Sequence, residues 1–189
     1  MERSEGGWLW LVAGGVAGWV PADEVVPFDR AIDHFTQLIQ ADPGSSYAYA
    51  QRGIIRSVKG ETDIAIADFD QAIRLDPKYA RAFNGRGNAW DDKGEYDRAI
   101  ADLTEAIRLD PKYARAFNNR GLAWSHKGEH DRAIVDFDEA IRLDPSLVWA
   151  FTNRSSLWYI KKEYDRAIVD CDQAIRLDPK DPLGFNNRG

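Results

Sequence analysis

Small and apolar residues recur along most of this chain at the spacing of an amphipathic helix. In residues 80–113 one such set stands at i, i+4 and i+7, and a second set follows after a polar break at Lys93, Gly94 and Glu95. The two sets are Phe83, Gly87 and Trp90, then Ala99, Leu103 and Ala106. Glycine in the break and Asp110-Pro111 at the end are typical helix stops. The pattern therefore predicts two helices joined by a glycine turn.

The same pattern returns every 34 residues. Asp-Pro pairs mark the interval, with prolines at Pro43, Pro77, Pro111, Pro145 and Pro179. A fixed period of this length predicts stacked helical repeats, since each unit can bury its apolar face only against a neighbour. We expect a lone second-type helix at 28–41, full repeats at 46–79, 80–113, 114–147 and 148–181, and a truncated repeat at 182–189.

These residues resemble the tetratricopeptide repeat family over positions 28–189. In the unit that begins at Ala114, the family's pattern of aromatic, small and turn residues falls on Phe117, Gly121, Trp124, Gly128, His130, Ala133, Phe137, Ala140 and Pro145. Two units depart from it, with Arg56 and Thr62 at aromatic sites and Ser155 and Lys162 at glycine sites. The resemblance implies an all-α fold, a right-handed superhelical solenoid whose first helices line a concave groove.

The opening residues do not follow the repeat. "WLWLV" alternates large side chains, "AGG" is a turn sequence and "VAGWV" follows, which predicts a short β-hairpin. Residues 8–26 resemble the closing half of a bacterial Src-homology-3-like barrel, so we expect 1–27 to be a partial β segment and the chain to be a piece of a longer protein. A membrane span needs about 20 apolar residues, and a signal peptide needs a basic start, so both alternatives are disfavoured.

Charge and cysteine content narrow the function classes. A formal net charge of -6 disfavours nucleic acid as a partner, because phosphate binding needs a basic face. The one cysteine, Cys171, cannot form an internal disulfide, which favours a cytoplasmic location. It stands where other repeats have Phe69, Leu103 and Phe137, so we expect a buried core thiol.

No catalytic, cofactor or metal motif stands out, and we expect no enzyme. His126 and His130 are four residues apart, but the turn at Gly128 separates them and zinc needs three or four ligands.

The resemblance assigns a set of first-helix positions to a peptide-binding groove: Gln51, Arg81, Asn84, Asn88, Arg115, Asn118, Asn119, Leu122, His126, Asn153 and Tyr159. We hypothesise that Asn84, Asn118, Asn119 and Asn153 contact the main chain of an extended peptide, because an amide both donates and accepts. The alternative is that these asparagines are only copied with the repeat. The family's carboxylate-clamp subtype is doubtful, because the basic residues it needs are absent from the corresponding positions.

Two charged series also keep the 34-residue period. Arg52, Arg86, Arg120 and Arg154 are each followed sixteen residues later by Asp68, Asp102, Asp136 and Asp170. We expect each arginine to form a structural ion pair with an aspartate of its own or the preceding repeat across the helix interface; the alternative is that both series are exposed and unrelated. The leading function is a module that binds a protein or peptide; the alternative is an architectural spacer or self-assembly module that links other domains of a longer protein. Homo-oligomers could form through apolar ends, where Trp8, Trp10 and Trp19 stand.

Overall fold

The structure is a computed structural model that describes residues 2–5, 8–13, 16–21 and 30–179. The predicted truncated repeat at 182–189 lies outside these residues. Nine helices lie within the described part: α1 Ala31–Ala41, α2 Ser46–Val58, α3 Thr62–Leu75, α4 Ala80–Asp92, α5 Tyr96–Leu109, α6 Ala114–His126, α7 His130–Leu143, α8 Val148–Ile160 and α9 Tyr164–Leu177. Three strands precede them: β1 Glu2–Glu5, β2 Trp8–Ala13 and β3 Val16–Pro21.

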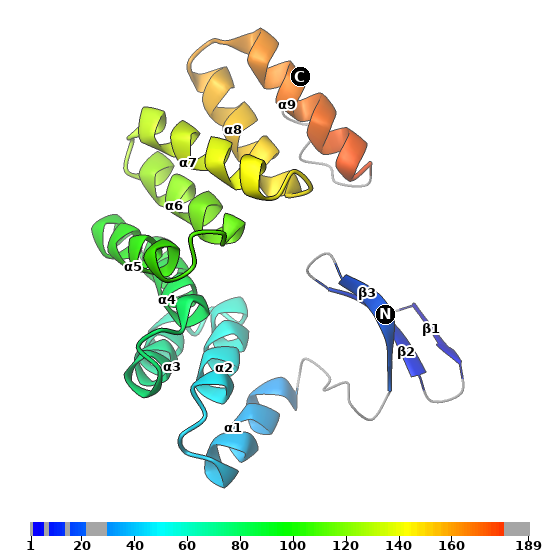
Figure 1. Cartoon of the computed structure of the whole chain (residues 1–189), viewed down its shortest axis with the longest axis vertical. Helices are drawn as coiled ribbons and strands as arrows, with labels where there is room; N and C mark the ends of the chain where they lie inside the picture. The colour runs from blue at the N-terminus through cyan, green and yellow to red at the C-terminus, as the bar shows by residue number, and fades with distance from the viewer. Residues whose placement is uncertain (1, 6–7, 14–15, 22–29, 180–189) are drawn as a thin grey trace.

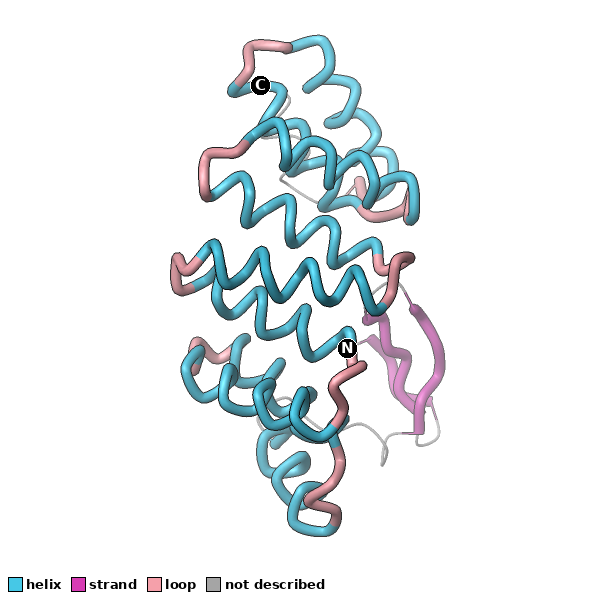
Figure 2. Tube along the Cα trace, turned by 60° about the vertical axis from the view of Figure 1, so that its left-hand side comes forward, coloured by secondary structure: helices cyan, strands magenta, loops and turns pink. Residues whose placement is uncertain are grey.

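The helices stack into an open solenoid that runs from α1 to α9 (Figures 1 and 2). Each predicted full repeat holds one pair of helices, and each second helix packs against the first helix of the next repeat. The first helices α2, α4, α6 and α8 also contact one another in succession. This contact places them together along one side of the array.

Asp-Pro turns end the second helices by a repeated hydrogen-bond pattern. The backbone N–H of Asp76 donates to the carbonyl of Ala72, and the Asp76 carboxylate accepts from the N–H of Lys78 at 2.9 Å. Asp110 repeats both bonds, with a carboxylate contact of 3.1 Å to the N–H of Lys112. The aspartate thus satisfies a turn donor while proline prevents the helix from continuing.

The turn inside each repeat needs a left-handed residue. Gly60, Gly94 and Gly128 have φ of 78°, 76° and 87°, while the fourth repeat has Lys162 at φ 63°. Glycine adopts this conformation without a steric penalty, and lysine does not.

The core of each repeat depends on a close crossing of its two helices. A Cβ added at Gly121 would lie 2.6 Å from Phe137, and one at Gly87 would lie 2.7 Å from Leu103. The fourth repeat has Ser155 and Cys171 at the same two positions, exposed by only 1% and 0%. The prediction that Cys171 is a buried thiol is therefore confirmed, and its smaller volume accompanies the larger residue at the glycine site.

The strands form one antiparallel sheet in the order β1-β2-β3. β2 and β3 pair from Trp8 opposite Pro21 to Ala13 opposite Val16, over the segments where the sequence predicts a hairpin. Residues 14–15, between these two strands, lie outside the described part. The three described strands make a simple meander, and pairing between neighbouring strands is common to many kinds of sheet. The resemblance to a Src-homology-3-like barrel is therefore not supported.

Candidate functional site

A groove of about 1100 Å³ runs along the first helices of the array. Its walls come from α2, α4 and α6, with Trp149 of α8 at one end and Tyr113 entering from the turn before α6. The groove follows from the repeat itself, because equivalent positions of successive helices face the same side.

Eight of the eleven predicted groove residues line it: Gln51, Arg81, Asn84, Asn88, Arg115, Asn118, Asn119 and Leu122. The other three lie elsewhere. Asn153 bonds to Asn118, His126 lies beside Asp91 at the edge, and Tyr159 stacks edge-on against Tyr164. Tyr159 therefore contacts the side chain of a second helix.

Sequence reasoning missed the floor of the groove. Gly85 occupies the position of Asn119 and Asn153, and a Cβ there would lie 2.5 Å from the ring of Phe69. The aromatic ring thus reaches the groove through the gap that glycine leaves. The missing side chain in one repeat was the only sequence signal for this contact.

Four asparagines form a continuous hydrogen-bonded chain across three repeats. Asn153 Nδ2 donates to Asn118 Oδ1 at 3.0 Å, Asn118 Nδ2 donates to Asn119 Oδ1 at 3.2 Å, and Asn119 Nδ2 donates to Asn84 Oδ1 at 2.9 Å. Asn118 is only 3% exposed, and both ends of its amide are used within the chain. It holds its neighbours in place, while Asn84, Asn119 and Asn153 are half-buried, and Asn84 and Asn119 line the groove.

The two margins of the groove carry opposite charge. Arg81 and Arg115 are the second residues of α4 and α6, and both side chains are exposed. Burial raises the pKa of Tyr113, while the charges of these two arginines oppose that rise, which places all three together.

The acidic margin lies at the other end of α4. Asp91 Oδ1 lies 3.0 Å from His126 Nδ1, and the histidine donates to it when that nitrogen carries a proton. Partial burial, followed by the neighbouring charge of Asp91, raises the pKa of Asp92, and His126 acts in the opposite direction. Two carboxyl groups thus stand together where a cation would relieve their repulsion.

Each arginine of the periodic series binds the aspartate of its own repeat, which is one of the two partners that the sequence left open. Arg120 binds Asp136 through Nε at 2.8 Å and Nη2 at 2.7 Å, and Arg86, Arg52 and Arg154 repeat the bidentate geometry with Asp102, Asp68 and Asp170. These aspartates are buried, with exposed fractions of 3% to 8%. The forks therefore tie the two helices of each repeat together with charge-assisted bonds.

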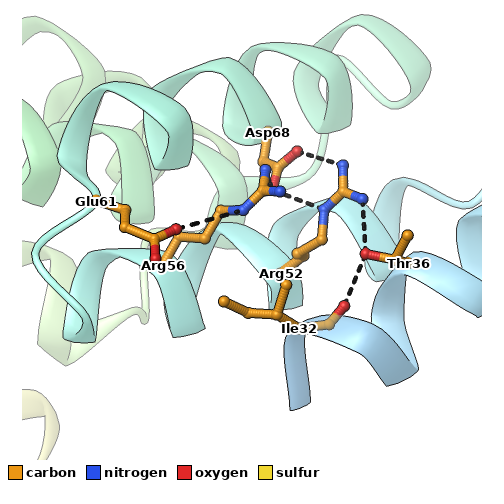
Figure 3. Close-up of polar contacts among 6 residues, drawn as sticks. All are labelled: Ile32, Thr36, Arg52, Arg56, Glu61 and Asp68. Carbon is orange, nitrogen blue, oxygen red and sulfur yellow. Dashed lines mark hydrogen bonds and ion pairs between the residues drawn. The ribbon is translucent and has the colours of Figure 1, made fainter. Parts of the chain in front are cut away.

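Each arginine also reaches back to the preceding repeat. Figure 3 shows Arg52 between Asp68 and Thr36, whose hydroxyl in turn donates to the carbonyl of Ile32. In the first repeat Arg56, which replaces the tryptophan of the other repeats, adds a bond of 2.7 Å to the same aspartate. The contact to Thr36 joins neighbouring repeats, while the bonds to Asp68 join paired helices.

The bonds shift the titration of three of these arginines. The hydrogen bonds that Arg86 donates to Asp102 raise the pKa of Arg86 despite the opposing effect of burial, and the bonds to Asp68 do the same for Arg52. For Arg154 burial is the largest effect and lowers the pKa, but bonds to Asp170 and Asp138 together outweigh it, so the net change is a rise.

Metal-binding groups are not gathered in the part of the chain that the structure describes, where no three histidine, cysteine or carboxylate side chains are close enough to hold an ion. None of the helices in the described residues is long and apolar enough to cross a membrane.

Comparison with known proteins identifies the repeat. A model of the tetratricopeptide repeat matches residues 51–112 and 91–148, which together span just over half of the chain. The chain belongs to the tetratricopeptide repeat family. The match begins after the strands and gives no support to a barrel at residues 8–26. No curated protein matches the chain in sequence.

Solved structures agree with this fold. A crystal structure of MamA is 28% identical with a TM-score of 0.68, covering 81% of this chain and 90% of its own. TTC0263 of Thermus thermophilus is 21% identical with a TM-score of 0.76 and coverages of 85% and 88%, and PilF of Pseudomonas aeruginosa is 22% identical with a TM-score of 0.71 and coverages of 85% and 82%. The family is one of protein-interaction scaffolds, so the groove belongs to a protein-binding module.

Proposed function

We propose that the chain binds an extended peptide segment of a partner protein in the groove formed by α2, α4, α6 and α8. The observation that carries this proposal is the asparagine chain, which presents amide groups at repeating intervals along the groove. A peptide main chain offers alternating donors and acceptors that such groups can meet without regard to its side chains.

Within this set we assign contact with the peptide to Asn84, Asn119 and Asn153. Asn118 has a supporting role, because it is buried, at 3% exposed, whereas the other three are only partly buried. We infer that the array is the right-handed superhelix that the resemblance implies, with the second helices on its convex side. A cytoplasmic location stays a prediction.

Peptide display followed by titration tests the groove. Peptides selected on the unmodified chain should bind the Asn119→Ala, Asn153→Ala double variant about thirtyfold more weakly, because two hydrogen bonds of about 1 kcal/mol each are removed. Gln37→Ala with Gln40→Ala is the matched control, since these amides lie on α1 outside the groove. Equal affinity of all three proteins, with unchanged circular dichroism, would assign the asparagines a purely structural role.

A second function, self-association, is favoured by the exposed face of α9. Ile168 is 41% exposed, whereas Ile134 at the equivalent position of α7 is only 7% exposed because α8 covers it. A second copy could cover the face of α9 in the same way. Light scattering over a range of concentrations tests this, and Ile168→Ser should abolish any dimer; a monomer at every concentration would contradict it.

A further inference from the structure

We propose that the groove selects an extended peptide whose three consecutive residues are acidic, basic and acidic, bound across α4 and α6. This inference rests on the proposed function, because it requires that a peptide occupies the groove. It adds the chemistry of the side chains that the groove accepts.

The basic margin supplies two separate cations. Arg81 and Arg115 stand at equivalent positions, 34 residues apart, so each belongs to a different first helix of the groove. The same position is Tyr47 in α2 and Trp149 in α8, both exposed. Cationic contacts are therefore confined to the two central repeats, with an aromatic side chain on either side of them.

The acidic margin supplies one anionic centre. Asp91 and Asp92 are the last two residues of α4, and His126 is the last residue of α6. Ten residues separate Arg81 from Asp91 along one helix, a rise of about 15 Å. The two margins are thus too far apart to neutralise each other directly, and a ligand that lies between them can contact both.

The asparagine chain lies between the margins, on residues 84, 118, 119 and 153. A main chain held there in an extended conformation sends successive side chains to opposite sides. Residues i and i+2 then face the same margin, about 6.6 Å apart by the strand rise. Two acids at i and i+2 can meet Arg81 and Arg115, while the base at i+1 meets Asp91 and Asp92.

Reordering the same three residues breaks this match. If the two acids are adjacent, one of them must face the acidic margin, where like charges repel. Partial burial and then Asp91 raise the pKa of Asp92, so a positive side chain placed beside it would stabilise its ionised form. The order of charges, and not the net charge of the peptide, is therefore what the groove distinguishes.

Calorimetric titration with two synthetic peptides tests the inference. Acetyl-Leu-Ser-Glu-Lys-Glu-Ser-Leu-amide has the matching order, and acetyl-Leu-Ser-Lys-Glu-Glu-Ser-Leu-amide has the same composition and charge. We expect the first to bind at least about fivefold more tightly in about 50 mM salt, with the preference shrinking as salt rises.

Variants test whether the basic margin causes the preference between the two peptides. The Arg81→Gln, Arg115→Gln variant should bind both peptides with the same affinity. Arg74→Gln with Lys78→Gln makes the same change in net charge on exposed residues outside the groove, so it should leave the preference intact.

Three results would overturn the inference, in distinguishable ways. In the first, the two peptides bind with equal affinity, and the Asn119→Ala, Asn153→Ala variant binds both more weakly. That result would contradict the selection by charge order but agree with the proposed function. A preference that persists in the Arg81→Gln, Arg115→Gln variant would place its origin outside the basic margin. Failure of both peptides to bind a chain that does bind its display-selected peptides would show that this charge pattern is not recognised.

Discussion

Arg120 shows how one residue can hold three helices. Its Nε and Nη2 donate to Asp136 of α7, and Nη1 donates to Thr104 of α5 at 3.2 Å. Asp136 is only 4% exposed, so its charge depends on this partner. A buried carboxylate without a partner is more costly than the absence of both charges.

Removing one member of the pair should therefore cost more than removing both. We expect Arg120→Ala to lower the free energy of unfolding by about 3 kcal/mol, and Arg120→Leu with Asp136→Ala to lower it by about 1 kcal/mol or less. Urea unfolding of the single and double variants measures the coupling. Arg108→Ala, which breaks an exposed pair with Glu105, is the control and should leave the free energy of unfolding nearly unchanged. Strict additivity of the single changes would contradict the buried pair.

The side chain that each arginine contacts in the preceding repeat is an aspartate in some repeats and a threonine in another, so mutation can exchange one for the other. Arg86 and Arg154 reach back to Asp70 and Asp138, whereas Arg120 reaches back to Thr104. Thr104→Asp should stabilise the chain by about 0.3–0.5 kcal/mol, since it adds a partly exposed ion pair at a site already within reach. Thermal unfolding at low and high salt measures it, and the gain should shrink with salt. Asp138→Thr is the reciprocal variant and should cost a similar amount; a gain from both changes would contradict the contact.

At the scale of the helix pair, the turn between α8 and α9 is the strained one. Lys162 has φ 63°, where the other repeats place glycine. Its N–H bonds to the carbonyl of Tyr159 in the same manner as Gly128 to Ser125, so the turn keeps its shape at the expense of the lysine backbone. A left-handed conformation costs a non-glycine residue about 1–2 kcal/mol.

Lys162→Gly should relieve that strain. We expect a net gain of about 1 kcal/mol in the free energy of unfolding, because the added flexibility of the unfolded chain offsets part of the relief. Gly128→Ala is the opposite change at the equivalent turn and should destabilise by a similar amount. A loss of stability in Lys162→Gly, measured by urea unfolding, would mean that the lysine side chain stabilises this turn by more than its backbone costs.

Sequence reasoning succeeded where a contact lies inside one repeat and failed where it depends on how repeats are placed. An ion pair between Arg120 and an aspartate of the periodic series could be predicted, because both positions keep the same period on helices that must pack; the choice of Asp136 in its own repeat was left open. The bond from Arg120 to Thr104 could not, since it depends on the offset between successive repeats. The same offset joins Asn84 to Asn119 and buries Asn118, which sequence alone placed on the ligand.

The residues of the groove likewise divide into those that the sequence predicted and those that it did not. The resemblance to the family implied which positions face the groove, and most of them line it. Tyr159 is not among the lining residues, and its ring packs edge-on against Tyr164 of the next helix, so its contact with a ligand stays a prediction. Phe69 was missed because its access to the groove depends on a side chain that Gly85 lacks.

Across the whole array, helices pack within a repeat or against the adjacent repeat. The free energy of unfolding is then the sum of the intrinsic stability of each repeat and of the interfaces between neighbouring repeats. Local stability need not be uniform along the chain. Within the described residues, α4 to α7 have neighbours on both sides, while α1 and α9 lie at the two ends of the stack (Figure 1).

Amide hydrogen exchange should show how local stability varies along the array. We expect the slowest amide exchange in α4 to α7, with protection falling toward α1 and toward α9, because an end helix can open without breaking the central interfaces. Lys162→Gly serves as a local probe: it should slow exchange in α8 and α9 by up to about fivefold, the factor that about 1 kcal/mol provides, and leave α2 and α3 unchanged. If exchange slowed equally in all helices, or if every helix had the same opening free energy, the array would be one cooperative unit and the nearest-neighbour description would be wrong.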